Sequence, residues 1–264
     1  MQKHGVNLAV VSKCRDLPYI DVANHSFSKG NRMARIIARI AARLRRGNGF
    51  LGLLSLAVVL MTAPVADAQD SDLSVYTGAQ MAPDSRIDFT DSLGASTGFT
   101  AGWDGNSAEW PPYFGVRYTR WVDDRFGWGL EFTHAKVYAD STTLAVNGFS
   151  RLEMTDGLNL LTLNGLRRWP NDSRWTPYVG LGVGVAVPHV EVITPLGNRT
   201  FEYQYTGPAL RLIAGVSYEI DDRWSVFAEY NGSYSSHDIA LTAGGRMQTE
   251  ITTHAINIGV TYRF

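Results

Sequence analysis

Residues 178–187 read YVGLGVGVAV, and this stretch decides the fold. Branched apolar side chains stand at every second position from Val179 to Val187, and glycine or alanine stands between them. This period of two is the pattern of a β-strand, whose successive side chains point to opposite faces of a sheet. Small residues fit the narrow interior of an eight-stranded barrel, and branched apolar residues suit contact with lipid. The stretch therefore predicts a transmembrane strand.

The sequence from Asp72 onward repeats this kind of segment. Eight runs of β-forming residues reach or exceed the length of about 10 residues that a tilted strand needs to cross a bilayer. They are residues 72–81, 112–122, 126–139, 156–169, 175–189, 203–219, 223–237 and 249–264. No window shows a sustained helical period. We expect an all-β fold, namely an eight-stranded antiparallel transmembrane β-barrel of up-and-down topology over residues 69–264.

The connections between these runs alternate in length. Residues 122–125, 170–173 and 220–223 are short and rich in Asp, Asn and Ser, which favour turns. The remaining connections are longer and cover residues 82–111, 140–155, 190–202 and 238–248. Short periplasmic turns opposite long external loops are typical of outer-membrane barrels. We therefore expect both termini to lie in the periplasm.

The sixth and seventh runs predict which side chains face inward. Residues expected outward are Leu210, Leu212, Ala214, Val216, Trp224, Val226, Ala228 and Tyr230. Residues expected inward are Tyr205, Arg211, Ser217, Glu229, Asn231 and Ser233. Arg211 and Glu229 lie on neighbouring strands, so we predict a salt bridge between them that satisfies both charges inside the barrel.

The end of the chain carries a second signal. Residues 257–264 read NIGVTYRF and resemble the terminal segment that the barrel-assembly machinery recognises in outer-membrane proteins. Ile258, Val260, Tyr262 and Phe264 share the expected lipid face. We expect that machinery to be a partner through Phe264, and the barrel to be a monomer.

An export signal precedes the barrel. Residues 33–68 place a basic stretch before an apolar run from Phe50 to Met61, followed by Ala66-Asp67-Ala68. This is the order of a secretory signal peptide, and an apolar run of about 12 residues is too short for a membrane anchor. We expect the segment 33–68 to be cleaved. Residues 1–32 fit neither a signal nor a domain, so we interpret them as an extension upstream of a true start at Met33.

Composition excludes several functions. After residue 69 the chain has 14 basic and 22 acidic side chains, which disfavours nucleic acid as a partner. Its single cysteine, Cys14, lies before the expected cleavage site, so no disulfide framework or cysteine-based metal site is expected. The three glycines of the 180–184 segment lie within a strand with no helix after them, so neither NAD nor flavin is expected.

Four histidines fall at the external ends of the expected strands: His134, His189, His237 and His254. Carboxylates lie nearby in the sequence, among them Asp156, Glu191 and Asp238. Histidines and carboxylates at one rim could bind a divalent metal ion or perform acid–base chemistry. The alternative is that loops are polar and tolerate histidine at the interface. Strand parity places His134 and His254 on the lipid side.

Several longer motifs resemble the lipid A oxidase family. They are EFTHAKVYAD (131–140), GF (148–149), EMTDGLN (153–159), VPHVEV (187–192), YTGPA (205–209) and YSSHD (234–238). The resemblance covers most of residues 72–264. It implies an outer-membrane enzyme that uses molecular oxygen to oxidise the proximal glucosamine of lipid A to 2-aminogluconate. Lipid A, or lipopolysaccharide, would then be the partner in the outer membrane.

We combine this resemblance with the rim cluster to predict a site. The expected catalytic residues are His134, His189, His237, Glu191 and Asp238. The expected substrate-binding residues are Lys136, Tyr138 and Arg151. The same histidines with His254 are the candidate metal ligands. Lys136 and Arg151 would hold phosphate or sugar groups of lipid A by charge-assisted hydrogen bonds.

Two other functions remain open. A lipid A deacylase barrel would use a Ser-His-acid arrangement, for which Ser235, Ser236, His237 and Asp238 are candidates. However, Ser236 and His237 point to opposite faces of a regular strand, and Ser235 with His237 reverses the order that the deacylases use. A non-enzymatic barrel, porin-like or engaged in surface interactions, would be compatible with any polar rim.

Overall fold

The computed structural model describes residues 71–264, and the expected extension and signal peptide lie outside this range. The strands are β1 (Ser71–Met81), β2 (Ser85–Thr90), β3 (Ser96–Ala101), β4 (Trp103–Asp104), β5 (Phe114–Trp121), β6 (Phe126–Ala139), β7 (Arg151–Arg168), β8 (Trp175–Ala186), β9 (His189–Ile193), β10 (Arg199–Tyr203), β11 (Gly207–Glu219), β12 (Trp224–Ala240) and β13 (Arg246–Arg263). Helix α3 covers Ser141–Asn147. Within residues 71–264 no helix is long and apolar enough to cross a membrane.

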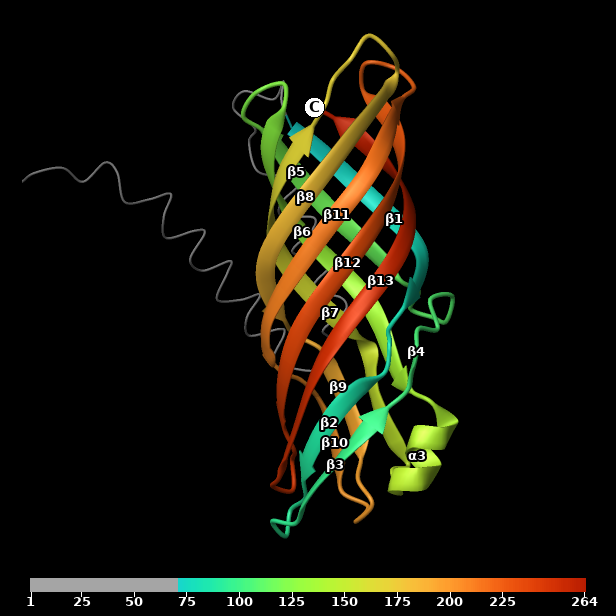
Figure 1. Ribbon diagram of the computed structural model, residues 1–264, viewed down its shortest axis with the longest axis vertical. Helices are drawn as coiled ribbons and strands as arrows, with labels where there is room; N and C mark the ends of the chain where they lie inside the picture. The colour runs from blue at the N-terminus through green and yellow to red at the C-terminus, as the bar shows by residue number, and fades with distance from the viewer. Residues whose placement is uncertain (1–70) are drawn as a thin grey trace, which may run out of the picture. The chain divides into compact units, whose positions relative to one another are not determined.

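Eight of these strands close a barrel (Figure 1). The order around it is β1, β5, β6, β7, β8, β11, β12 and β13, and β13 pairs back to β1. Every neighbouring pair is antiparallel, including β6 with β7, which completes the closure. The predicted eight-stranded antiparallel barrel is therefore confirmed.

The three tight turns lie together at one end of the barrel, here called the turn end (Figure 1). Asp123 accepts hydrogen bonds from the backbone N–H groups of Arg125 and Phe126, both at 2.7 Å. Asp221 accepts the equivalent pair from Arg223 and Trp224. A short acidic side chain thus caps its own turn, which explains the repeated Asp-rich chemistry of these connections.

The opposite end, here called the loop end, has more structure than its expected loops. Residues 82–111 form the hairpin β2–β3, which pairs with β13, and the short strand β4, which pairs with β6. Residues 189–203 form the hairpin β9–β10, which pairs with β7. These hairpins can form because β7 and β13 are 18 residues long, whereas about 10 cross a bilayer, and the excess offers edges for pairing.

Two details of the predicted strands are corrected at this end. The fifth run stops at Ala186, and His189 instead opens β9. Tyr205, expected inside, lies in the connection before β11 and is 66% exposed. Both differences arise because the chain leaves the barrel wall at residues 187–206 to build the extra hairpin.

An apolar core stabilises the loop end. Its buried side chains come from β2, the segment after α3, β7, β9, β12 and β13 and include Ile87, Phe89, Phe149, Leu152, Val190, Val192, Ile239 and Met247. Phe149 contacts Phe89 edge-to-face, with ring centroids 5.2 Å apart. Helix α3 is capped by Asp140, whose carboxylate accepts from the Thr143 N–H, and by Gly148 at φ 72°. The loop end is consequently a packed head.

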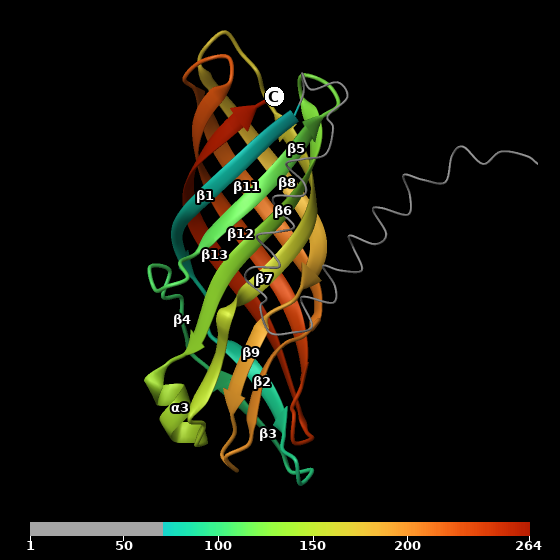
Figure 2. The same cartoon turned by 180° about the vertical axis from the view of Figure 1, so that it is seen from behind.

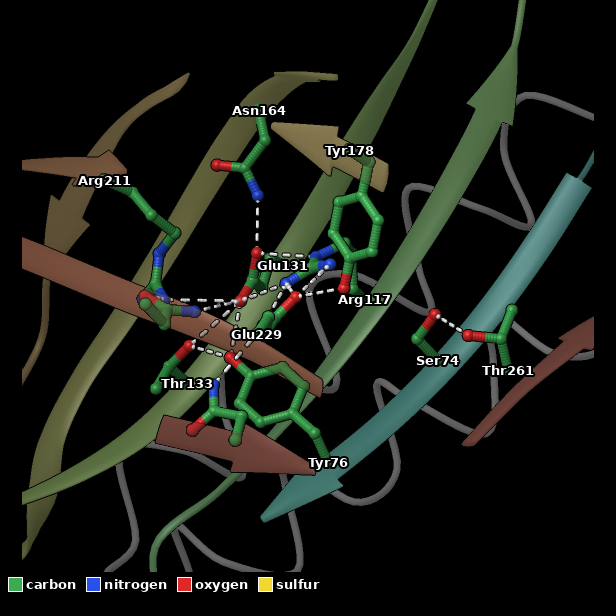
Figure 3. A network of polar contacts seen from close by, with 12 residues as sticks. Ser74, Tyr76, Arg117, Glu131, Thr133, Asn164, Tyr178, Arg211, Glu229 and Thr261 are labelled. Carbon is green, nitrogen blue, oxygen red and sulfur yellow. Dashed lines mark hydrogen bonds and ion pairs between the residues drawn. The ribbon is translucent and has the colours of Figure 1, made fainter. Parts of the chain in front are cut away.

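The barrel interior holds a buried ion network (Figure 3). Glu131 accepts from Arg117 at 2.9 Å, Arg211 at 3.3 Å, Tyr76 at 2.5 Å and Asn164 at 2.6 Å. Glu229 accepts from Arg117 at 2.8 Å and from Tyr178 at 2.8 Å. Two guanidinium groups thus balance two carboxylates. This network forms the inner end of a cavity of about 250 Å³ that opens at the turn end and is lined in part by Arg117, Thr119 and Tyr178.

The predicted alternation is confirmed, but the predicted pair Arg211–Glu229 is wrong. Arg211, Glu229, Asn231 and Ser233 are all buried inside the barrel. The β11–β12 register, however, places Arg211 opposite Ser233 and Gly215 opposite Glu229. A four-residue offset along a strand is about 13 Å, which is too far for an ion pair. Arg211 therefore bonds Glu131 and Asn231, and Glu229 bonds Arg117.

We expect Gly115→Ala to destabilise the barrel by about 1–3 kcal/mol. A methyl group at Gly115 would overlap the ring of Tyr76, which covers this glycine and donates to Glu131. Urea unfolding of the barrel in detergent micelles measures the effect. Gly165→Ala is the matched control, because the nearest atom to its added methyl group is 3.9 Å away. Equal stability of the two variants would contradict the prediction.

Candidate functional site

A polar cluster lies on the outward face of β6, β7, β9 and β10 at the loop end, here called the wall site. Figure 2 shows this side, where β9 continues the sheet from β7. The register of β6 and β7 shifts between Ala135 and Val137, and Gly157 has φ 92°. Such a bulge bends the strand and redirects side chains. Here it leaves Lys136 opposite the irregular stretch of β7 that contains Asp156.

His189 occupies the centre of the wall site. Its ring contacts those of Phe201 and Tyr203, with centroids at 4.4 and 4.6 Å, and the residue is only 4% exposed. Its Nδ1 atom has no hydrogen-bond partner and lies 3.9 Å from Oδ2 of Asp156. Burial lowers the pKa of His189, although the charges of Asp156 and Glu191 act in the opposite direction. The imidazole is therefore neutral at pH 7 and can accept a proton.

Asp156 is the accessible carboxylate beside this histidine. Its side chain is 48% exposed, and its Oδ2 accepts a hydrogen bond of 3.4 Å from the hydroxyl of Tyr203. Burial, with the Asp156 charge, raises the pKa of Tyr203 to about 12, so the phenol keeps its proton. Carboxylate, neutral imidazole and phenol together form a set that can move a proton.

Lys136 and His134 lie next to this set and are buried. The Nζ atom of Lys136 donates to the backbone carbonyls of Glu109 and Pro111, both at 3.0 Å, and lies 5.1 Å from the ring centroid of Tyr138. His134 stacks on Phe114 and bonds Asn159 at 3.0 Å through Nδ1. Its Nε2 is buried without a partner. His134 points outward, as the strand parity predicts, and Lys136 points the same way but is covered by the segment that contains Glu109 and Pro111.

Two arginines lie farther from the barrel on the same face. Arg151 contacts Glu153 at 2.9 Å and Glu191 at 3.6 Å. Arg199 contacts Glu191 at 2.6 Å and lies over the ring of Phe201 at 4.5 Å. Glu191 is buried, whereas both arginine side chains are about half-exposed. The buried carboxylate thus orients two guanidinium groups toward the outside.

Three predicted site residues lie elsewhere. His237 points into the head, where Nε2 bonds Ser235 at 2.8 Å and Nδ1 bonds Thr206 at 2.8 Å. Asp238 pairs with Arg246 on the far part of β12 and β13. His254 bonds the hydroxyl of Tyr230 at 2.6 Å on the outer face. The structure therefore groups His134, His189, Glu191, Lys136, Tyr138 and Arg151, but leaves these three apart.

The donor set does not fit a metal ion. Across residues 71–264, no three His, Cys, Asp or Glu side chains lie close enough together to hold one. Ser235 and His237 do form a hydrogen-bonded pair, but both are buried within the head, and the third member is Thr206 in place of a carboxylate. This arrangement does not favour a hydrolase.

Sequence reasoning missed Tyr203 and Arg199 and left Asp156 out of the predicted site. A loop over residues 190–202 assigns Arg199 to no strand face, and Asp156 and Tyr203 stand at the first positions of the predicted runs 156–169 and 203–219. A signal was present, because residues 194–198 read TPLGN, a turn with glycine, between two alternating segments. That pattern predicts a hairpin and would have placed Tyr203 opposite His189, as observed.

Comparison with known proteins agrees with the closed barrel. Residues 53–264 match the family model described as outer membrane protein beta-barrel domain. The chain belongs to this family. It is therefore an outer-membrane barrel. A comparison with curated proteins found no match.

Several solved outer-membrane proteins resemble this chain at low sequence identity. Neisserial surface protein A has 13% identity and a TM-score of 0.44, with 74% of this chain and 97% of that chain covered. OprG from Pseudomonas aeruginosa has 14% identity and a TM-score of 0.44, with coverage of 74% and 98%. The protease OmpT from Escherichia coli has 7% identity and a TM-score of 0.42, with coverage of 77% and 99%.

Proposed function

We propose that this outer-membrane barrel is an enzyme that oxidises the proximal glucosamine of lipid A to 2-aminogluconate with molecular oxygen. The observation that carries the proposal is the pairing of an accessible Asp156 with a buried, neutral His189 on the outward wall of the barrel. In this proposal the loop end faces the outside of the cell, and both termini lie in the periplasm.

The position of the wall site suits a lipid substrate. The site lies on the outward face of the strands at the loop end, where β7 extends beyond the length that a bilayer requires. A sugar at the membrane surface could reach it by lateral movement of the lipid within the membrane. Inside the barrel, the ion network and the apolar core lie between the cavity at the turn end and the loop end, so the proposed route of the substrate to the wall site is over the outer surface.

The chemistry requires a proton acceptor at the anomeric hydroxyl group. His189 would take the proton from the C1 hydroxyl, and Asp156 would stabilise the resulting imidazolium. The hydrogen on C1 and two electrons would pass to dioxygen in successive one-electron steps, because ground-state dioxygen is a triplet, and with the proton held by His189 the dioxygen would leave as hydrogen peroxide. The sugar becomes a lactone, and water opens the lactone to 2-aminogluconate. Oxygen is the acceptor that the resemblance to lipid A oxidases implies.

A direct substrate contact would come from Arg151, the predicted cationic residue whose side chain is accessible. Arg151 is about half-exposed and can donate to a phosphate or a sugar hydroxyl. Lys136 places a positive charge under the 109–112 segment, and Tyr138 lies against it. Because the described histidines and carboxylates do not assemble a metal site, no step of the proposed reaction is assigned to a metal ion.

Mass spectrometry of lipid A tests the proposal directly. The chain is expressed in a host with unmodified lipid A, and 1-dephosphorylated lipid A is supplied as acceptor. A mass gain of one oxygen atom that depends on air is the expected result. Loss of an acyl chain would instead indicate a deacylase. Unchanged lipid A, with the barrel folded in the outer membrane, would favour a surface-interaction barrel.

The pH dependence of activity is a second test. Because burial lowers the pKa of His189, neutral imidazole persists below the usual histidine pKa of about 6.5. Activity should therefore fall along an acidic limb centred below pH 6.5, as His189 becomes protonated. The profile of kcat/KM against pH measures this. An acidic limb centred at or above pH 6.5 would contradict the assignment of His189 as base.

A further inference from the structure

The hairpin β9–β10 carries a row of side chains that leads away from the barrel. On β10, Arg199, Phe201 and Tyr203 alternate along one face, and the register sets Tyr203 opposite His189 and Phe201 opposite Glu191. On β7, Arg151 and Glu153 continue the same face, with Glu153 opposite Glu191. The row therefore begins at Asp156 and His189 and ends at the two arginines.

The direction of this row follows from the strand order. β7 runs from Arg151 at the loop end to Arg168 at the turn end, so Arg151 is farther from the membrane than Asp156. Arg199 lies at the distal end of β10, four residues from Tyr203, or about 13 Å along the strand. One sugar ring at Asp156 and His189 could not reach Arg199. A second unit attached on its outer side could.

The distal part of the row has the chemistry of an anion site. Arg151 contacts Glu153 at 2.9 Å and the buried Glu191 at 3.6 Å, and Arg199 contacts Glu191 at 2.6 Å, so these two carboxylates hold the guanidinium groups in place. Each arginine has five N–H donors, and both side chains remain about half-exposed. Phe201 is 53% exposed and offers its ring between Arg199 and His189. A sugar ring can pack against the exposed part of the Phe201 ring, while the arginines bond its charged group.

We propose that Arg151, Arg199 and Phe201 form a second subsite, which binds an anionic sugar attached on the outer side of lipid A. This inference rests on the proposed function, since it takes Asp156 and His189 as the position of the reacting glucosamine. The substrate would then be lipopolysaccharide that carries at least one acidic sugar, in preference to free lipid A. The recognised group is an oxyanion, either the carboxylate of a sugar acid or a phosphate on the sugar.

Binding to three acceptors tests the subsite without requiring turnover. The full chain in detergent micelles is titrated with 1-dephosphorylated lipid A, with the same lipid bearing one carboxylate sugar, and with the same lipid bearing one phosphorylated sugar. Affinity should rise about tenfold when the acidic sugar is present, as expected for one added charge-assisted contact. A rise in affinity for the carboxylate form or for the phosphate form identifies the anionic group that the subsite recognises. Equal affinity for all three acceptors would overturn the proposal.

Variants assign the effect to the subsite. The test quantity is the ratio of the affinity for lipid A that bears the acidic sugar to the affinity for lipid A without it. Arg199→Gln and Phe201→Ala should each bring this ratio close to one. Arg86→Gln is the matched control, because Arg86 is an exposed arginine paired with Asp88 on β2. A ratio that persists in both Arg199→Gln and Phe201→Ala would overturn the assignment. If the ratio behaves as expected but no oxidation occurs, the subsite stands and the proposed reaction fails.

Discussion

Replacement of Glu131 by alanine is expected to destabilise the barrel by about 3–5 kcal/mol, because it leaves buried positive charge without its partner. Glu131 is the only carboxylate paired with Arg211 among the described residues, and it shares Arg117 with Glu229. Arg211 already has Nε and Nη2 without hydrogen bonds. Removal of Glu131 would leave that guanidinium buried with Asn231 alone.

Urea unfolding in detergent micelles, followed by tryptophan fluorescence, measures this loss. Glu131→Gln should cost less than Glu131→Ala, since the amide oxygen can still accept from Tyr76 or Arg117. Glu219→Ala is the matched control: Glu219 is an exposed acid paired with Arg263 at 3.5 Å, and exposed pairs contribute about 0–1 kcal/mol. A change at Glu131 no larger than the change at Glu219 would show that the network does not hold the barrel together.

Asp156→Asn is expected to lower kcat/KM for lipid A oxidation by about 100-fold or more, as for removal of a group in a proton-transfer pair. The amide keeps the shape and can still bond Tyr203, but it does not carry the charge that would stabilise protonated His189. His189→Ala should cause a similar loss. The double variant should be little worse than either single variant, because the two groups act as one unit.

Steady-state kinetics on 1-dephosphorylated lipid A, with oxygen consumption as readout, measures the effect. The loss should fall mainly on kcat if Asp156 acts in the proton transfer, and on KM if it only contacts substrate. Asp88→Asn, an exposed carboxylate on β2 paired with Arg86, is the matched control. Full activity of Asp156→Asn, with the barrel folded, would remove the Asp156–His189 pair from the mechanism.

The barrel strands were predictable because their determinants are local. The alternation of Val179–Val187 with glycine or alanine depends only on the period of a strand, and the inward position of Glu229 and Asn231 follows from the same period. Asp123 and Asp221 cap turns within two or three residues of themselves. Such signals need no knowledge of neighbouring strands.

The partners of inward residues were not predictable in the same way. Parity places Arg211 and Glu229 inside but does not say which partners they meet. That depends on the register between strands and on the distance across the lumen. The register separates Arg211 from Glu229, and closure of the barrel brings Arg211 to Glu131, 80 residues away in the chain.

The sequence by itself determined the period of the strands, the turns and the outward position of His134 and His254. Only the tertiary structure decided that Asp156, His189 and Tyr203 meet and that His237 lies apart from them. The bulge in β6–β7 and the pairing of β9–β10 with the free edge of β7 bring the three together. Those pairings depend on contacts between segments distant in the chain, because a strand edge is satisfied by whichever hairpin the closed barrel brings to it.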